Sequence, residues 1–437
     1  MDGMRVAVLP NRIGTAGLRT DALLSLFEGA PAGRDGSVGT GLIRETHKAL
    51  GRSPNAAAWD LAAVALAVIA ADRYVNRAAV SEDGWTRQIE LTVSVTDPAR
   101  WTAMSPAVRE MLGFLTGDVW SLVFLPDGVQ PRPPARVVGH RPETCVSLLS
   151  GGLDSLIGAI DLAAAGERPL FVSNRVRGDC SKQANFAGAV GARHHVLSLN
   201  HNARVRCHAP EISQRPRSLA FLAFGVIAAA TLDRYLAGEV VDLVVPENGF
   251  ISLNVPLTHL RAGSLSTRTT HPRFLAALQA VIDGLGLRVR LINPYRHKTK
   301  GEMMLECADQ ALVSRLAPNS MSCGRGGRIN RHCGQCLPCL VRRSAFLRHG
   351  GTLAADTTSP PYLHPGPGGA FTSPEFSRYD DVMQCLAAID TLDRRGGRRW
   401  IGSAIPASTV PEAEACREVA VRGLLEIKAF MRAAGLL

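Results

Sequence analysis

The chain has 437 residues, 46% of them hydrophobic, which is enough for two or three folded domains with sizeable cores. Its 49 Lys and Arg against 38 Asp and Glu give a net charge of +11, which favours acidic partners such as nucleotides, nucleic acid or carboxylate substrates. The most apolar stretch, from Ser218, meets Asp233 and Arg234 before it could span a bilayer, so we expect a soluble, cytoplasmic protein with no membrane partner.

The first 125 residues mix the patterns of strands and helices. Short apolar or alternating runs predict strands at 4–10, 87–95 and 120–126, and longer apolar runs predict helices at 56–75 and 107–115. Residues 1–125 are therefore expected to form an N-terminal α+β domain. Residues 126–143 contain five prolines, too many for a helix or strand, and are expected to be a linker.

Strands and helices alternate from Thr144 onwards. The expected strands are 144–149, 170–174, 194–199, 241–246 and 287–294; the expected helices begin near Leu153, Cys180, Ser218 and Pro272. Such alternation predicts an α/β fold with a doubly wound parallel sheet, here over residues 144–348. A Gly/Pro-rich run and two helical patterns, near Asp380 and Glu412, predict a mostly helical extension over 349–437.

A glycine-rich turn follows the first of these later strands and leads into a helix. Its residues are Ser150, Gly151, Gly152, Leu153, Asp154 and Ser155. Glycines let backbone N–H groups converge on an anion, and the helix dipole favours negative charge at the same point. The turn thus predicts a phosphate site, and the alternative is a plain Gly-rich turn with a helix cap. It is neither a Walker A loop nor a GxGxxG fingerprint.

These six residues resemble the SGGxDS signature of the PP-loop ATP pyrophosphatases. The resemblance implies an enzyme that cuts ATP between the α and β phosphates, adenylates a carbonyl or carboxylate oxygen and releases pyrophosphate. It also implies that Asp154 helps to hold Mg²⁺ from a surface loop, with Asp154 and Ser155 as catalytic residues.

A later segment supplies positive charge. Thr299 and Glu302 have the spacing of a capping box, which would point a helix N-terminus into the same crevice. Lys298 and Lys300 would then bind the departing pyrophosphate, with Lys300 catalytic. The alternative is a surface capping box with solvated lysines.

Four of the ten cysteines crowd into one short segment, which favours a metal site in a reducing compartment over disulfides. Cys323, Cys333, Cys336 and Cys339 have spacings that suit tetrahedral Zn²⁺. Four protein ligands leave no open position, so the zinc is expected to be structural. His332 could replace one thiol, and an iron–sulfur cluster is the alternative, since PP-loop enzymes that thiolate tRNA can carry one.

The SGGLDS loop, the later lysine segment and the cysteine pattern together resemble the 7-cyano-7-deazaguanine synthase (QueC) family over about residues 145–344. The resemblance implies that ATP adenylates a 7-deazaguanine carboxylate and that an amine then displaces AMP to give an amide, which the synthases dehydrate to a nitrile with a second ATP. The synthases lack the long flanking segments, and a longer QueC-like protein with such additions resembles the QatC family of Qat antiphage defence systems. The stretches 214–225 and 246–272 are similar to that branch and depart from the synthases, which leaves the nitrile product open.

The polar segment after the strand at 241–246 is the expected substrate site, because doubly wound sheets bind ligands at such strand ends. Glu247 and Asn248 are expected to read the purine-like edge, and Arg261 or Arg268 to hold the substrate carboxylate. The alternative is a loop that only caps helices. The resemblance further implies that adenine meets the backbone of Leu148 and Val172.

Three functions remain open from the sequence. The first is an adenylating enzyme that forms a deazaguanine amide with ammonia or with an amine of a partner protein in a defence operon. The second is a tRNA-modifying PP-loop enzyme, although the Arg/His-rich run at 193–217 lacks interleaved aromatics and favours a solvated loop. The third is a non-catalytic nucleotide-sensing subunit. A glutamine-fed amidotransferase is disfavoured, since no cysteine precedes Cys145 to act as a nucleophile.

Overall fold

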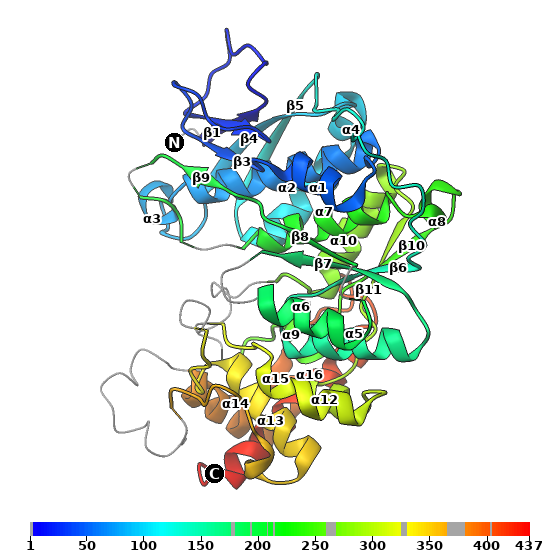
Figure 1. The fold of residues 1–437 in the computed structure, drawn as a ribbon. Coiled ribbons are helices and arrows are strands. Elements are labelled where there is room, and N and C mark those ends of the chain that lie inside the picture. The colour runs from blue at the N-terminus through cyan, green and yellow to red at the C-terminus, as the bar shows by residue number, and fades with distance from the viewer. Residues whose placement is uncertain are drawn as a thin grey trace.

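The computed structural model describes residues 3–175, 180–192, 195–207, 209–212, 215–258, 268–324, 330–364, 381–402 and 404–437. Two sheets are stacked with helices between them, and a group of helices lies at the end of the molecule remote from the first sheet (Figure 1). The N-terminus lies at the first sheet and the C-terminus among the remote helices (Figure 1).

The first sheet has the order β5-β4-β1-β2-β3-β9. Its strands are β1 (Met4–Leu9), β2 (Ala22–Leu26), β3 (Gly36–Val38), β4 (Gln88–Ser94), β5 (Val119–Leu125) and β9 (Arg204–Val205). All pairs are parallel except β3 with β9. This differs from the α+β unit that the sequence suggested. Strand β3 is connected to β4 by helices α1 (Leu42–Leu50), α2 (Ala56–Tyr74) and α3 (Arg77–Val80), and β4 is connected to β5 by α4 (Pro98–Thr116). These helical crossovers return the chain to the sheet in the same direction, which makes the strands parallel.

The second sheet confirms the predicted doubly wound fold. Its order is β11-β10-β6-β7-β8, formed by β6 (Cys145–Leu148), β7 (Pro169–Asn174), β8 (Val196–Leu199), β10 (Val241–Val244) and β11 (Val289–Ile292). Every pair is parallel. The strand order reverses between β6 and β10, and the loops that follow these two strands leave a crevice at their carboxyl ends.

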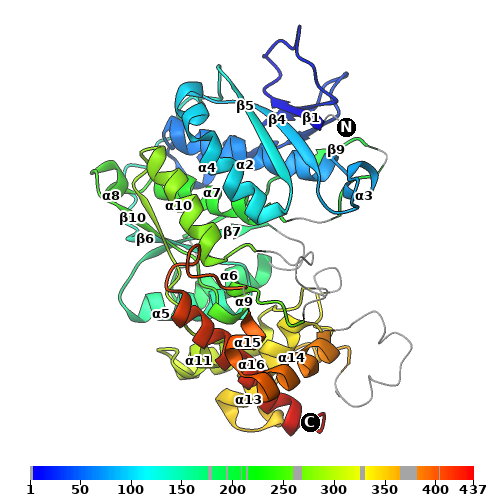
Figure 2. The same ribbon diagram turned by 180° about the vertical axis from the view of Figure 1, so that it is seen from behind.

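The two sheets share one hydrophobic core. Helix α2 packs on α7 (Arg217–Ala229) and α4 packs on α10 (Pro272–Gly284), as Figures 1 and 2 both show. Fifteen of the 19 residues of α2 are buried, as expected for a helix that is apolar on nearly every side. Buried side chains run without interruption from β1 to β11, so no gap in the core marks the boundary predicted between the first two domains.

Residues 126–144 contain neither helix nor strand. They pass along α1, where the Val138 N–H donates to Gly51 O at 2.9 Å and Arg52 Nε donates to Val138 O at 3.0 Å. The proline-rich segment is therefore held against the N-terminal half by backbone contacts.

The other face of the second sheet is covered by α5 (Leu153–Ala164) and α6 (Cys180–Ala189) (Figure 1). Beyond them α9 (Gly249–Leu253), α13 (Leu337–Gly350), α14 (Asp381–Arg395), α15 (Gly397–Ile401) and α16 (Ala413–Ala433) form a separate core. The remaining helices are α8 (Asp233–Leu236), α11 (Lys300–Leu305), α12 (Gln310–Leu316) and the 3-10 turns Ala317–Asn319 and Leu353–Ala355. None of the described helices has the length and apolarity needed to cross a membrane.

Candidate active site and metal centre

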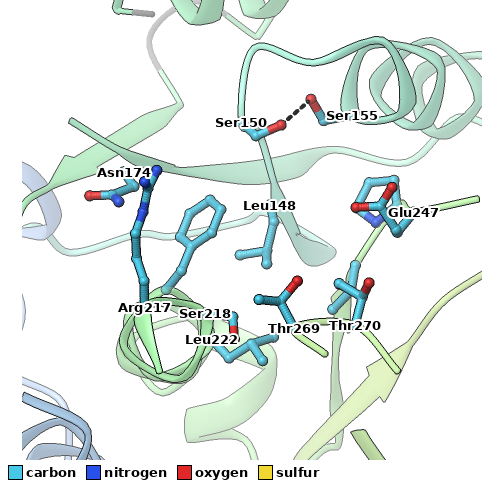
Figure 3. A pocket seen from close by; sticks show the side chains of 13 residues that line it. Leu148, Ser150, Ser155, Asn174, Arg217, Ser218, Leu222, Glu247, Thr269 and Thr270 are labelled. Atoms are coloured by element: carbon cyan, nitrogen blue, oxygen red, sulfur yellow. Dashed lines mark hydrogen bonds between the residues drawn. The ribbon is translucent and has the colours of Figure 1, made fainter. Parts of the chain in front are cut away.

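The SGGLDS loop joins the end of β6 to the start of α5. Gly151 has φ of +88°, a left-handed conformation that favours glycine. Gly152 is the N-cap of α5, and no side chain caps the helix there, so the first-turn N–H groups point out of the helix without a side-chain acceptor. The Ser150 and Ser155 hydroxyls lie 3.1 Å apart across the loop (Figure 3). This is the geometry expected of an anion site, and phosphate binding stays a prediction.

The loop is supported from behind by the segment that leads to the cysteine cluster. The Met321 N–H donates to Gly151 O at 2.9 Å. A Cβ on Gly152 would lie 3.1 Å from Met321 O, which is a tight contact, so the close approach of the two backbones favours glycine. Met321 is two residues from Cys323, which connects the geometry of the loop to that of the metal-binding segment.

Asp154 differs from the expected loop carboxylate. It lies in the first turn of α5 and is buried. Its Oδ1 pairs with Lys300 Nζ at 2.5 Å, and its Oδ2 accepts from the side chain and backbone of Asn248 at 2.7 and 3.1 Å. Both oxygens therefore already have protein partners.

The charges around Asp154 shift two carboxyl groups in opposite directions. Burial alone would raise the pKa of Asp154, but the Lys300 charge and hydrogen bonds to its neighbours hold that pKa below its ordinary value. Burial, followed by the nearby Asp154 charge, raises the pKa of Glu247 well above its ordinary value. The two carboxyl groups beside the loop thus differ: Asp154 loses its proton more readily than an ordinary carboxyl group, and Glu247 retains its proton more strongly.

Lys300 is brought to Asp154 by the predicted capping box. Thr299 Oγ1 accepts from the Glu302 N–H at 3.1 Å, and Glu302 Oε2 accepts from the Thr299 N–H at 2.8 Å. Lys298 does not join the site as expected, because its Nζ pairs with Glu306 at 2.7 Å. It precedes the cap, whereas Lys300 is the first residue of α11.

Helix α16 of the C-terminal extension holds this segment in place. The buried Glu426 carboxylate accepts from the Thr299 hydroxyl and, at 3.3 Å, from the Gly301 N–H. Arg422 Nε pairs with Glu302 at 2.9 Å. The extension is therefore part of the support of Lys300, a role that the sequence patterns did not indicate.

A cavity of about 370 Å³ opens beside the loop at the carboxyl ends of β6, β7 and β10 (Figure 3). Its lining includes Leu148, Ser150, Ser155, Asn174, Arg217, Ser218, Thr269, Thr270 and Glu247. Two of its lining residues, Asn174 and Ser218, each have a buried polar atom, Oδ1 and Oγ, with no hydrogen-bond partner among the described residues. Because buried polar groups are nearly always paired, these atoms indicate a place for a ligand.

The predicted substrate residues divide into two groups. Glu247 lines the cavity as expected (Figure 3). Asn248 does not, because it is fully buried, caps α9 through the Ile251 N–H and holds Asp154. Val172 is likewise buried within the second sheet, whereas Leu148 reaches the cavity.

Of the two predicted arginines, Arg268 is the one that the structure describes, and it does not line the cavity. Arg268 Nη1 donates to Phe114 O at 3.0 Å, and its guanidinium stacks 4.7 Å from the Phe114 ring, which directs it towards α4. Arg261 lies outside the described residues. Arg217, from the first turn of α7, lines the cavity instead.

The four cysteines form one compact cluster. Their sulfur atoms all lie within 4.8 Å of one another, with Cys323–Cys336 and Cys333–Cys339 separations of 3.7 and 3.9 Å. Four sulfurs at about 2.3 Å from a tetrahedral Zn²⁺ would be roughly 3.8 Å apart, so the cluster fits zinc. A four-iron cluster would place each thiolate on a different iron and spread them further.

His332 is not a fifth candidate ligand. Its Nε2 accepts from the Ser322 N–H at 3.0 Å, and its ring lies 5.6 Å from that of Tyr362. Burial lowers the pKa of His332 to about 3, so it stays neutral and serves as an acceptor.

No family model matches the chain. Among curated proteins it is similar to the 7-cyano-7-deazaguanine synthase of Paracoccus denitrificans (strain Pd 1222), with 28% identity over 223 residues, 46% of this chain and 87% of the relative. It is 26% identical to the synthase of Rhizobium etli (strain CIAT 652), over 46% of this chain and 86% of the relative. It is also 26% identical to the 7-cyano-7-deazaguanine synthase 1 of Sphingopyxis alaskensis (strain DSM 13593 / LMG 18877 / RB2256), over 47% and 93%. Together with the loop and the cysteine cluster, these similarities support a QueC-like assignment for slightly less than half of the chain.

Proposed function

We propose that this chain is a QueC-like, ATP-dependent carbon–nitrogen ligase of the cytoplasm. It adenylates a 7-deazaguanine carboxylate, releases pyrophosphate and transfers the acyl group to an amine, which gives an amide. The proposal rests on one observation. The Gly-rich start of α5 has no side-chain cap and adjoins a cavity at the switch point of a doubly wound sheet, and the residues that line this cavity include Asn174 and Ser218, whose buried polar atoms have no partner among the described residues.

ATP would lie with its phosphates against the loop. The first-turn N–H groups of α5 and the Ser150 and Ser155 hydroxyls are donors for the two terminal phosphates, which leave together. Mg²⁺, when bound, would neutralise phosphate charge, and the Ser150 and Ser155 hydroxyls offer oxygen ligands of the kind that it prefers. Asp154 would act mainly by holding Lys300 beside the loop.

The proposed reaction has two steps. A substrate carboxylate oxygen attacks the α phosphorus, the bond to the bridging oxygen of the β phosphate breaks, and pyrophosphate leaves with the electron pair. An amine nitrogen then attacks the acyl carbon, AMP leaves, and the amine loses one proton.

The cavity suits a single bicyclic base. Its volume of about 370 Å³ lies near the lower end of ligand pockets in general. Guanine-like edges carry N–H donors beside a carbonyl acceptor, which Glu247, Asn174 Oδ1 and the Ser218 hydroxyl can complement. The Arg217 guanidinium at the same cavity suits the substrate carboxylate.

The amine is proposed to belong to a partner protein of an antiphage defence system. The matched synthases are aligned over 86–93% of their own length but over only 46–47% of this chain. More than half of this chain is thus additional to the matched part, which supports a macromolecular acceptor rather than ammonia.

A second candidate is a nitrile synthase, because the relatives are named 7-cyano-7-deazaguanine synthases. Mass spectrometry of the purified protein with ATP, Mg²⁺ and 7-carboxy-7-deazaguanine, with and without proteins of its operon, separates the two. We expect AMP, pyrophosphate and a deazaguanine mass added to a partner protein. A free nitrile with no modified partner supports the synthase, ADP and phosphate refute the adenylation, and no nucleotide product indicates a nucleotide-sensing subunit.

A further inference from the structure

A second cavity, of about 800 Å³, lies on the N-terminal half between α1 and the proline-rich segment. We call it the α1 groove. Among the residues that line it are Phe27, Ile43, Arg44, Lys48, Pro134 and Arg136. It is separate from the cavity beside the SGGLDS loop, with which it shares no lining residue.

The groove carries positive charge that the described protein does not neutralise. Arg44, Lys48 and Arg136 are exposed, and none forms an ion pair with a carboxylate among the described residues. Among the described residues that line the groove there is no Asp or Glu. Burial lowers the pKa of His47, which also lines the groove, so the three exposed cations set the charge of the groove near neutral pH. Such a surface attracts an anionic partner.

The groove also has apolar walls, which favour a polypeptide over nucleic acid. Ile43, Pro134 and Val138 line the groove together with the cations. The Phe27 ring in its lining is only 6% exposed and packs edge-on against Trp59 at 5.7 Å, so it offers no face for a base to stack on. The His47 ring also packs edge-on against Trp59, at 6.2 Å. An acidic peptide with apolar side chains complements both features.

One end of the groove adjoins the edge of the sheet where the active-site cavity opens. Arg175 pairs with Glu45 of α1 at 3.4 Å, and the preceding residue, Asn174, lines that cavity. The Gly39 N–H, just before α1, donates at 2.6 Å to the carbonyl of His201, which follows β8. The start of α1 thus lies at the carboxyl edge of the second sheet.

We propose that the α1 groove docks an acidic, partly apolar polypeptide segment of the protein that supplies the amine. This inference rests on the proposed function for the identity of the partner, whereas the binding itself follows from the charge and shape of the groove.

The test uses a short fluorescein-labelled synthetic peptide of alternating Glu and Leu, with binding followed by fluorescence anisotropy. The variant Arg44→Glu/Lys48→Glu reverses two charges in the groove. The matched control, Arg398→Glu/Arg399→Glu, reverses two exposed charges on α15. We expect the groove variant to bind the peptide at least roughly tenfold more weakly, and the control to bind it like the wild type.

Two results would overturn the proposal. One is equal weakening in both variants, which would indicate non-specific attraction to a basic protein. The other is groove-dependent binding of a single-stranded DNA oligonucleotide that exceeds peptide binding, which would make this a nucleic-acid surface.

A parallel assay separates this inference from the proposed function. With ammonia as the amine, the groove variant should release AMP at the wild-type rate, because none of its changes lies at the cavity. If the wild-type protein releases no AMP, the proposed function fails while the peptide result still decides whether the groove binds acidic chains. Equal loss of AMP release and peptide binding, with an unchanged melting temperature, would contradict a separate docking role.

Discussion

Replacing Asp154 by Ala should destabilise the protein as well as abolish ATP cleavage. The Asp154 and Lys300 side chains are only 7% and 6% exposed, and their charged atoms lie 2.5 Å apart. Removing the carboxylate takes away the ion-pair partner of the buried Lys300 ammonium group. It also removes the shorter of the two hydrogen bonds that Asn248 Nδ2 donates, which leaves the one to Glu247 Oε1 at 3.3 Å. Breaking a buried ion pair in this way costs about 3–5 kcal/mol in the free energy of unfolding.

The double variant Asp154→Ala/Lys300→Met isolates the interaction. It removes the buried charge together with its partner, so we expect it to be about 2 kcal/mol more stable than Asp154→Ala alone, while ATP cleavage stays lost in both. Asp242→Ala is the matched control, because it breaks a surface pair with the 64% exposed Arg290 and should lower the free energy of unfolding much less than Asp154→Ala does.

Urea unfolding followed by tryptophan fluorescence gives the free energies, and pyrophosphate release gives the activity. A loss below about 1 kcal/mol in Asp154→Ala would refute the buried-pair reasoning. So would a double variant whose destabilisation equals the sum of the two single ones. Pyrophosphate release at the wild-type rate from either Asp154 variant would mean that the SGGLDS loop is only a turn.

Three further predictions concern the metal, the pH dependence and the C-terminal helix. The purified protein should hold about one colourless Zn²⁺ per chain by elemental analysis, and a brown, iron-containing protein would contradict this. The variant Cys336→Ser should lose the zinc and should also have a raised KM for ATP, because the hydrogen bond from Met321 to Gly151 joins the metal site to the SGGLDS loop. Burial lowers the pKa of His271 to about 4, and the neutral ring caps α10, so the free energy of unfolding that it contributes above pH 6.5 is lost as the pH falls. Between pH 7 and pH 5 the wild type should lose about 2 kcal/mol more of its free energy of unfolding than His271→Asn, whose cap does not titrate. Equal pH slopes of the two proteins in urea unfolding would contradict this. Glu426→Gln should loosen the start of α11 and so lower kcat for AMP release by roughly tenfold, with little change in the KM for ATP or in zinc content. An unchanged kcat would contradict the supporting role of α16.

The sequence predicted best those features that depend on neighbouring residues. The SGGLDS turn and the capping box are set within a few positions of the chain, and the four thiols lie within one short segment, so their arrangement follows from spacing. The parallel second sheet was predictable for a similar reason, since strand and helix alternate regularly.

The features that the sequence did not predict depend on distant segments. Asn174 and Ser218 meet only because the end of β7 lies beside the start of α7. Glu426 reaches Thr299 across 127 positions. The sequence alone does not distinguish Lys298 from Lys300. Lys300 follows the helix cap and forms a buried ion pair, whereas Lys298 precedes the cap and forms a surface ion pair. The parallel N-terminal sheet was missed because β3 has only three residues and β2 five.

The continuous core between the two sheets has a consequence for how an acceptor protein would be used. Helix α2 belongs to the half that carries the α1 groove, and it packs directly on α7, whose first turn lines the active-site cavity. Because the groove and the cavity are built on one shared core of described residues, we expect their spacing to be a fixed length that an acceptor must bridge with its own chain. An extended chain advances at most about 3.3–3.6 Å per residue. The distance from groove to cavity therefore sets the smallest number of residues that can separate the docked segment from the reactive amine. Amines closer along the chain than this length would stay out of reach, whereas a longer connection would lower the rate only gradually as its ends become harder to bring together.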